Sequence, residues 1–318
     1  MLSDKLKRCM PALVATAILI SSSFAAYAQD PAAARRTRIN LAVASNFFGV
    51  PPSNSAITDL ITAFEKENPN YRVVVVDNGA TATLADHIIN GNTRRVDLFL
   101  AADTATPLDL LTNHFGLVTT YNNSLTPPLY IFNYAQGVLA LLSNIRGVDL
   151  SCETGTCGYD PRVYRTVAIA DPSLAPYGVA AQTVLTGIYG LAPPLSTNSL
   201  VHEYPNITAT YNAVIAQTDP VGFVAMSAIC SEGKFPTSGT SALPYFAIQA
   251  NPLSPLMLMN NYNPLTQAGI AVKRPGGRTD AQNTELEAFV DFLTDFTTSP
   301  SPDSPMITTL KKFCYSAP

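Results

Sequence analysis

The stretch Tyr71-Arg72-Val73-Val74-Val75-Val76-Asp77 places four valines in a row between polar residues. An apolar, β-branched run of this kind is typical of a central strand that is buried on both faces. The neighbouring elements predicted from hydrophobic periodicity are strands over Arg38–Ala44 and Asp97–Ala101 and helices over Ala56–Glu67, Ala82–Ile89 and Thr104–His114. Strands and helices that alternate in this way favour βαβ units, and therefore a mostly parallel sheet with helices on both faces.

The pattern changes over Tyr130–Asn144, where two apolar runs adjoin with no helix predicted between them. We expect a crossing strand here that leaves the first sheet for a second one. The elements predicted after it are strands over Arg165–Ala170, Val221–Ala225 and Ala268–Val272, helices over Gly178–Ile188, Ile207–Gln217 and Asp280–Phe296, and mostly loop over Cys230–Pro264. The predicted fold class is therefore α/β, with two lobes, two mixed, mostly parallel sheets flanked by helices, and crossing strands between the lobes. In such folds ligands bind beyond the carboxyl ends of the strands.

The N-terminus has the three parts of a secretory signal peptide. Lys5, Lys7 and Arg8 form a basic region, Met10–Ile20 is apolar, and Ala26-Tyr27-Ala28 is a cleavage site. We therefore expect an exported protein. The predicted organisation is a signal peptide over residues 1–28, lobe 1 over 29–125, lobe 2 over 126–265, and a return to lobe 1 with C-terminal helices over 266–318.

Charged residues make up only 13% of the 318 residues, and the formal net charge is −4. The basic surplus that sequence-independent binding of nucleic acid requires is absent, so we expect no nucleic-acid partner. No apolar run of about 18 residues, the length that spans a membrane, follows the signal peptide. These counts favour a soluble, compact protein of one large or two medium domains.

Motifs of known enzymes are missing from the sequence. It contains no G-x-S-x-G, H-E-x-x-H, P-loop or glycine-rich dinucleotide motif, and its three histidines are isolated. We therefore expect no enzyme, no cofactor and no protein-bound metal. A secreted hydrolase is the alternative, with paired carboxylates drawn from Asp97, Asp103 and Asp171, although Asp103 and Asp171 are expected at caps or turns.

Four cysteines follow the signal peptide, namely Cys152, Cys157, Cys230 and Cys314. An exported chain meets an oxidising compartment, so two disulfides are expected, with three pairings possible. We favour Cys152–Cys157, which closes a short loop, and Cys230–Cys314, which holds the C-terminal tail. A thiolate metal site is the rival interpretation, but the C-x4-C spacing without clustered histidines supports it poorly.

Four strand ends carry hydroxyls or glycines beside predicted helix starts. These segments are Ala44–Asn46, Asn78–Thr83, Asp171–Gly178 and Pro205–Ile207. Helix N-termini present free N–H groups and a positive dipole end, so several that face one cleft make an anion site without basic side chains. Each segment alone is better explained as an ordinary N-cap, whereas four in one topology favour a site.

Five segments resemble motifs of the molybdate-binding receptors of ABC importers, and they occur in the order of that family. They are Val43–Phe47, Gly79–Leu84, Val96–Asp103, Ile169–Gly178 and Gly222–Ser227, and together they span most of residues 38–295. The resemblance implies a type II periplasmic binding fold, a periplasmic location, and a monomer that works with an ABC permease in the inner membrane.

The resemblance also implies a site for a tetrahedral oxyanion such as molybdate or tungstate. Two hydroxyls and several main-chain N–H groups would hold it: the hydroxyls of Ser45 and Thr81 and the N–H groups of Tyr177 and Ile207. Much of the family has a tyrosine where this chain has Ala225, with Ser227 close behind as a substitute donor. The chain also has about seven extra residues, Phe47–Ser53, before the first predicted helix.

Two alternatives share the receptor fold. One is a receptor for a different small anion, such as a small organic anion. The other is a ligand sensor that passes its state to a membrane partner, which the sequence does not separate from uptake.

Overall fold

A computed structural model describes residues 36–49, 55–121, 128–145, 150, 152–153, 156–157, 165–230, 245–248, 262–298 and 302–318. All of these residues belong to one compact unit, Arg36–Pro318. The predicted signal peptide and its cleavage site therefore lie outside the described residues. Among the helices described, none is long and apolar enough to cross a membrane.

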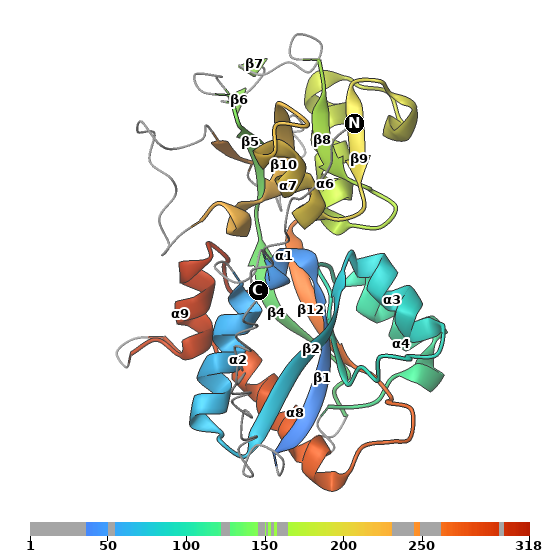
Figure 1. Ribbon diagram of the computed structural model, residues 1–318, viewed down its shortest axis with the longest axis vertical. Helices are drawn as coiled ribbons and strands as arrows, with labels where there is room; N and C mark the ends of the chain where they lie inside the picture. The colour runs from blue at the N-terminus through green and yellow to red at the C-terminus, as the bar shows by residue number, and fades with distance from the viewer. Residues whose placement is uncertain are drawn as a thin grey trace, which may run out of the picture. The chain divides into compact units, whose positions relative to one another are not determined.

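The first sheet has five strands in the order β2-β1-β3-β12-β4 (Figure 1). Their bounds are Tyr71–Gly79 for β2, Thr37–Ala44 for β1, Leu98–Leu100 for β3, Leu265–Ala271 for β12 and Ile131–Gly137 for β4. Strand β1 is parallel to β2 and β3, whereas β12 is antiparallel to β3 and β4. The sheet is mixed, and its parallel part comes from the predicted βαβ units.

The prediction that the valine run forms a central strand is wrong, because β2 lies at the edge of the sheet. Val73 is 4% exposed and the next three valines are half-buried, since helices α2 (Ala56–Glu67) and α3 (Thr81–Ile89) pack against the strand. An apolar run indicates cover on two faces of a strand, and it carries no information on the number of neighbouring strands.

The second sheet has the strand order β11-β5-β10-β8-β9. The bounds are Tyr245–Ile248 for β11, Leu139–Ser143 for β5, Val221–Ala225 for β10, Val167–Ala170 for β8 and Val201–Tyr204 for β9. Strand β5 is antiparallel to β10 and β11, and β8 is parallel to β10 and β9. Strand β9 is not among the predicted elements, and β11 falls within the predicted loop. A separate two-stranded ladder joins β6 (Cys152–Glu153) to β7 (Thr156–Cys157).

The predicted crossing strand is confirmed by the two sheets. Strand β4 ends at Gly137 in the first sheet, and β5 begins at Leu139 in the second, so the chain changes sheet at Val138. Strand β4, which we expect in lobe 2, therefore pairs with strands of the first sheet. The lobe boundaries themselves stay a prediction.

Helices cover both faces of each sheet. The remaining helical elements are α1 (Ser45–Phe48), α4 (Ala105–Asn113), η2 (Phe115–Leu117), α6 (Pro176–Tyr189), η3 (Leu195–Thr197), α7 (Ile207–Ile215), η4 (Met226–Ala228), α8 (Asp280–Leu293) and α9 (Pro305–Lys312). Helices α2, α8 and α9 pack on one face of the first sheet and α3 and α4 on the other (Figure 1). Helices α6 and α7 pack on opposite faces of the second sheet. This arrangement brings the N-termini of α3, α6 and α7 to the strand ends that carry the predicted site.

Candidate functional site

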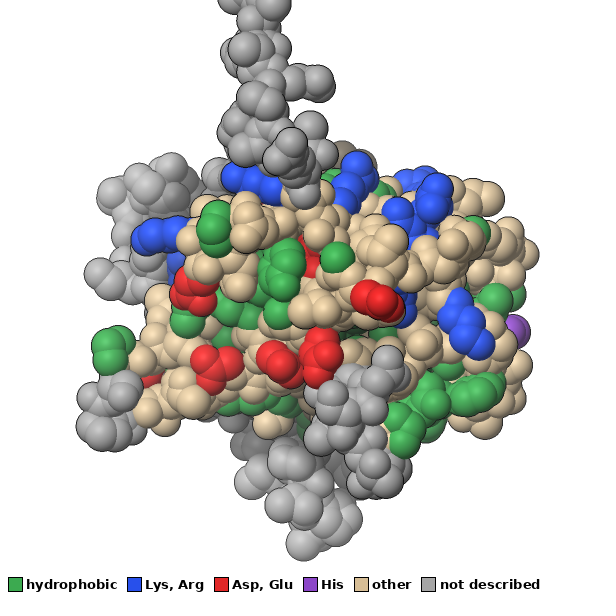
Figure 2. Space-filling view, turned by 90° about the horizontal axis from the view of Figure 1, so that it is seen from below, with side chains coloured by type: hydrophobic (Ala, Val, Ile, Leu, Met, Phe, Trp, Pro, Cys, Tyr) green, Lys and Arg blue, Asp and Glu red, His purple; other side chains and the backbone are tan. Residues whose placement is uncertain are grey.

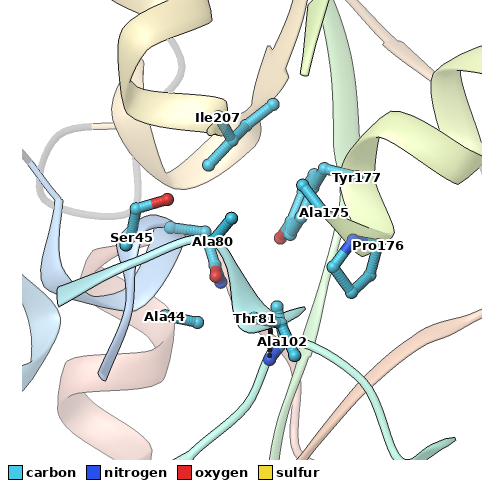
Figure 3. Close-up of a pocket in the computed structure, with 11 residues that line it drawn as sticks. Ala44, Ser45, Ala80, Thr81, Ala102, Ala175, Pro176, Tyr177 and Ile207 are labelled. Carbon is cyan, nitrogen blue, oxygen red and sulfur yellow. Dashed lines mark hydrogen bonds between the residues drawn. The ribbon is translucent and has the colours of Figure 1, made fainter. Parts of the chain in front are cut away.

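A small pocket lies where the strand ends of the two sheets meet (Figure 3). Its lining comes from the turns after β1, β2 and β3 and from the N-termini of α6 and α7: Ala44, Ser45, Asn46, Gly79, Ala80, Thr81, Ala102, Ala175, Pro176, Tyr177 and Ile207. None of these side chains is charged. The space left free in the pocket is small, about what one water molecule needs. It suits a compact ligand that accepts hydrogen bonds.

Ser45 begins α1 directly after β1, and it is 6% exposed. Its side chain does not cap the helix, and its hydroxyl points toward the pocket (Figure 3). The start of the extra segment follows at once: Phe47 is fully buried and packs edge-on against Tyr134 and Tyr315. The insertion therefore begins in the core and leaves Ser45 at the pocket.

Thr81 is the first residue of α3 and is 1% exposed. Its hydroxyl oxygen accepts a hydrogen bond from the Ala102 N–H at 3.1 Å (Figure 3). Because a hydroxyl has one proton and two lone pairs, this bond leaves the proton of Thr81 able to donate into the pocket.

Two helix N-termini supply main-chain donors from the second sheet. Helix α6 begins with Pro176, which has no N–H, so the Tyr177 amide is the first donor of that helix. Ile207 is the first residue of α7, behind the N-cap Asn206, whose side chain accepts from the Ala209 N–H at 2.9 Å. The amides of Tyr177 and Ile207 have no partner four residues back in their helices, as is usual for a first turn.

The structure brings Ser45, Thr81, Tyr177 and Ile207 to one pocket, but it places Ser227 elsewhere. The Ser227 hydroxyl donates to the main-chain oxygen of Asn46 at 3.3 Å, and neither Ser227 nor Ala225 lines the pocket. Asn46 lines the pocket instead of Ser227. It belongs to one of the four strand-end segments, but the motif comparison does not single it out.

Two hydrogen bonds join the rims of the pocket across the sheets. Thr208 donates from its hydroxyl to the main-chain oxygen of Ser45 at 3.1 Å, and the Ala82 N–H donates to the Leu174 oxygen at 3.0 Å. Neither contact is visible in the sequence, because each pairs a side chain or amide with a main-chain oxygen more than 90 residues away. They hold the two sides of the pocket together.

The three aspartates of the hydrolase alternative are used structurally. Asp97 is fully buried and lies 3.3 Å from Arg274, and burial raises its pKa. Asp103 accepts from the Thr106 N–H at 2.8 Å, and Asp171 accepts from the Ser173 N–H at 2.8 Å, as expected of a cap and a turn. None of the three lines the pocket, so they form no acid pair there.

The predicted Cys230–Cys314 disulfide is confirmed, with the two Cα atoms 5.9 Å apart. For the other predicted pair, the β6–β7 register sets Cys152 opposite Cys157, whereas their side chains lie outside the described part of the chain. Among the described residues, no group of three His, Cys, Asp or Glu side chains could hold a metal ion.

The family model for bacterial extracellular solute-binding proteins matches residues 39–298, which is most of the chain. The protein belongs to this family. As a solute-binding protein it is a binding protein rather than an enzyme, in agreement with the sequence prediction.

Relatives of this solute-binding protein carry molybdate in their names. It is 31% identical over 203 residues to the molybdate-binding protein ModA of Azotobacter vinelandii, covering 64% of this chain and 70% of the relative. It is 28% identical over 206 residues to ModA of Rhodobacter capsulatus, covering 62% of this chain and 63% of that relative. The structure of the Azotobacter vinelandii periplasmic molybdate-binding protein matches with a TM-score of 0.62 at 22% identity, covering 88% of this chain and 99% of that one. These matches confirm the resemblance to the molybdate-binding receptors and the predicted α/β fold class.

Proposed function

We propose that this protein is the periplasmic receptor of an ABC importer and that it binds molybdate, tungstate or a similar tetrahedral oxyanion. The observation that carries the proposal is the convergence of the Ser45 and Thr81 hydroxyls with the Tyr177 and Ile207 amides on one pocket. Hydrogen bonds to an ionised acceptor are about twice as strong as neutral ones. Helix N-termini also stabilise negative charge. The names of the relatives favour the same ligand class and location.

The lining argues for recognition by hydrogen-bond donors rather than by overall charge. The protein has a formal net charge of −4, and no lysine or arginine lines the pocket. On the face in Figure 2, Lys and Arg side chains lie mostly along the upper and right parts, and Asp and Glu side chains lie below them and to the left. A neutral cage of this kind selects its ligand by size and by ionisation state, because a protonated oxygen would meet a donor.

A receptor for another small anion is the second candidate. Ser227 is hydrogen-bonded to Asn46, so the end of β10 adds no hydroxyl to the lining, whose hydroxyl-bearing residues are Ser45, Thr81 and Tyr177. In either case the partner is an ABC permease, or, for a sensor, a signalling protein of the membrane.

Calorimetric titration of the ligand-free protein with molybdate, tungstate, sulfate and phosphate tests the ligand. We expect heat and a rise in melting temperature with the first two. Absence of both effects with molybdate and with tungstate would overturn the assignment.

Thr81→Ala tests the site itself. We expect affinity for molybdate to fall by about 1–3 kcal/mol, because a charged oxygen loses its donor. Thr81→Ser keeps the hydroxyl and should bind nearly as the natural protein does. Thr294→Ala is the control, because the half-buried Thr294 donates to the Val290 oxygen at the end of α8, and α8 does not line the pocket. Equal affinities for Thr81→Ala and the natural protein would remove Thr81 from the site.

A further inference from the structure

The C-terminal tail, residues Phe313–Ser316, is anchored at three places around the pocket. Ser316 and Gln136 exchange two main-chain hydrogen bonds of 2.9 and 3.1 Å, so the tail pairs with β4 just before the chain changes sheet at Val138. Cys314 is joined by the disulfide to Cys230, just after η4. The third anchor is the hydroxyl of Tyr315, a side chain that is 6% exposed.

The Tyr315 hydroxyl lies within a closed polar cluster with Asn46 and Ser227. It is 2.9 Å from the main-chain oxygen of Asn46 and 2.9 Å from the Ser227 hydroxyl, and it accepts from the Asn46 side-chain amide at 3.2 Å. Ser227 in turn donates to the Asn46 oxygen. All three residues are at most 7% exposed. Buried hydrogen bonds of this kind fix the positions of their members, since water does not compete for them.

This cluster acts on the pocket through Asn46. Asn46 and Ser45 form the turn that lines the pocket after β1, and Tyr315 holds both the main chain and the side chain of Asn46. The Tyr315 ring also packs edge-on against Phe47, the next residue, at a centroid distance of 5.4 Å. Tyr315 therefore contacts this turn at three points: the main-chain oxygen of Asn46, the side-chain amide of Asn46 and the ring of Phe47.

We propose that Tyr315 is a positioning residue for the anion pocket, and that the Cys230–Cys314 disulfide holds it there. The tail fixes the Ser45–Asn46 turn against η4, which contacts α1 directly and does not line the pocket. This inference rests on the proposed function only for the identity of the ligand.

Molybdate titration of Tyr315→Phe tests the role in binding. We expect the dissociation constant to rise at least tenfold. Tyr262→Phe is the matched control, because Tyr262 is 2% exposed, its hydroxyl accepts from the Leu139 N–H at 2.8 Å, and Tyr262 is not a lining residue. Urea unfolding of both variants separates affinity from stability. A Tyr315→Phe affinity within threefold of the natural protein, or an equal loss in both variants, would overturn the proposal.

The disulfide is tested by the double variant Cys230→Ser/Cys314→Ser, which leaves the other cysteines untouched. We expect at least a threefold loss of affinity. Added to Tyr315→Phe, the same change should cause little further loss, because both act through one contact. If the affinity loss of the combined variant equals the product of the two separate losses, the disulfide and Tyr315 act independently, and the proposed link between them is refuted.

Hydrogen exchange in the ligand-free protein separates this inference from the ligand assignment. The Gly49 N–H bonds the Ser45 oxygen at 2.8 Å and reports on the turn. We expect its exchange to accelerate at least fivefold in Tyr315→Phe and to stay unchanged in Tyr262→Phe. This result supports the positioning role even if no oxyanion binds, whereas unchanged exchange in Tyr315→Phe refutes it whatever the ligand.

Discussion

Gly137→Ala is the substitution for which the structure gives the clearest geometric expectation. Gly137 is the last residue of β4, at the point where the chain leaves the first sheet. A Cβ atom there would lie 2.0 Å from the Tyr177 hydroxyl oxygen, 2.9 Å from the side-chain nitrogen of Gln267 and 3.1 Å from Tyr177 Cζ. Tyr177 is 1% exposed and borders the pocket, so its ring is packed by other residues except on the side of the pocket.

The size of the effect follows from these distances. Non-bonded heavy atoms normally rest about 3.5 Å apart, so the new methyl and the phenol oxygen would have to separate by about 1.5 Å. Overpacking of this kind costs about 1–3 kcal/mol, and we expect a loss of about 2–3 kcal/mol in the free energy of unfolding. Because the Tyr177 amide belongs to the pocket, displacement of this residue should also weaken molybdate binding about tenfold, which is about 1.4 kcal/mol.

Tyr177→Phe supplies the test of the cause. The Tyr177 hydroxyl is buried and at most shares a weak hydrogen bond with the Asn46 side chain, so its removal should change stability by no more than about 1 kcal/mol. In the Gly137→Ala/Tyr177→Phe double variant the 2.0 Å contact is gone, and most of the stability and affinity should return.

The assay is urea unfolding of the four proteins in a double-mutant cycle, followed by molybdate titration. Gly116→Ala is the control, because a Cβ atom at Gly116 meets nothing within 4 Å. The reasoning is refuted if Gly137→Ala is as stable as Gly116→Ala, or if Tyr177→Phe rescues neither stability nor affinity.

Two further substitutions test one hydrogen bond and one buried carboxyl group. Thr208→Val removes the hydrogen bond to the Ser45 oxygen, and molybdate affinity should fall by about 0.5–1.5 kcal/mol. The exposed Thr183, which bonds Val179 within α6, serves as control in Thr183→Val; equal affinities would contradict a role for the contact. Burial raises the pKa of Glu285 to about 8 from 4.5, so between these pH values the folded chain keeps a proton that the unfolded chain releases. The free energy of unfolding should therefore fall as pH rises, by up to about 1.4 kcal/mol per unit. Glu285→Gln should reduce the slope of the free energy of unfolding against pH, measured by urea unfolding between about pH 5.5 and about pH 8. An unchanged slope would assign the pH dependence to another group.

Local periodicity was enough to predict most elements of the first sheet. Helix α2 matches its predicted bounds, and β1 and α3 differ from theirs by one residue at one end. These elements are amphipathic or fully apolar, so their patterns carry the information. Strand β9 contains His202 and Glu203 among its four residues, and its apolar pattern is too short to detect. The position of β2 at the edge of the sheet depends on the strand order, which the sequence of a single segment does not determine.

The candidate site was likewise predicted only in part from the sequence. Ser45, Thr81, Tyr177 and Ile207 follow strand ends or open helices, and parallel strands bring such positions to a common edge. Ser227 also follows a strand, but the short η4 turn directs its hydroxyl to Asn46 instead. Tyr315 lies 269 positions from Asn46, and no local pattern indicates that a C-terminal tyrosine supports a turn near the N-terminus.

The low count of charged residues has a structural meaning that the total does not reveal. Several basic side chains serve buried carboxylates: Arg274 and Arg278 lie 3.3 and 3.6 Å from Asp97, and Arg94 lies 3.0 Å from Asp77. A buried carboxylate without a partner is strongly destabilising, so these arginines are committed to the fold. None of them lines the pocket, where the proposed donors are uncharged hydroxyls and amides. An anion bound there would depend on the positions of these donors, which is why a positioning contact such as that of Tyr315 should matter more than the net charge.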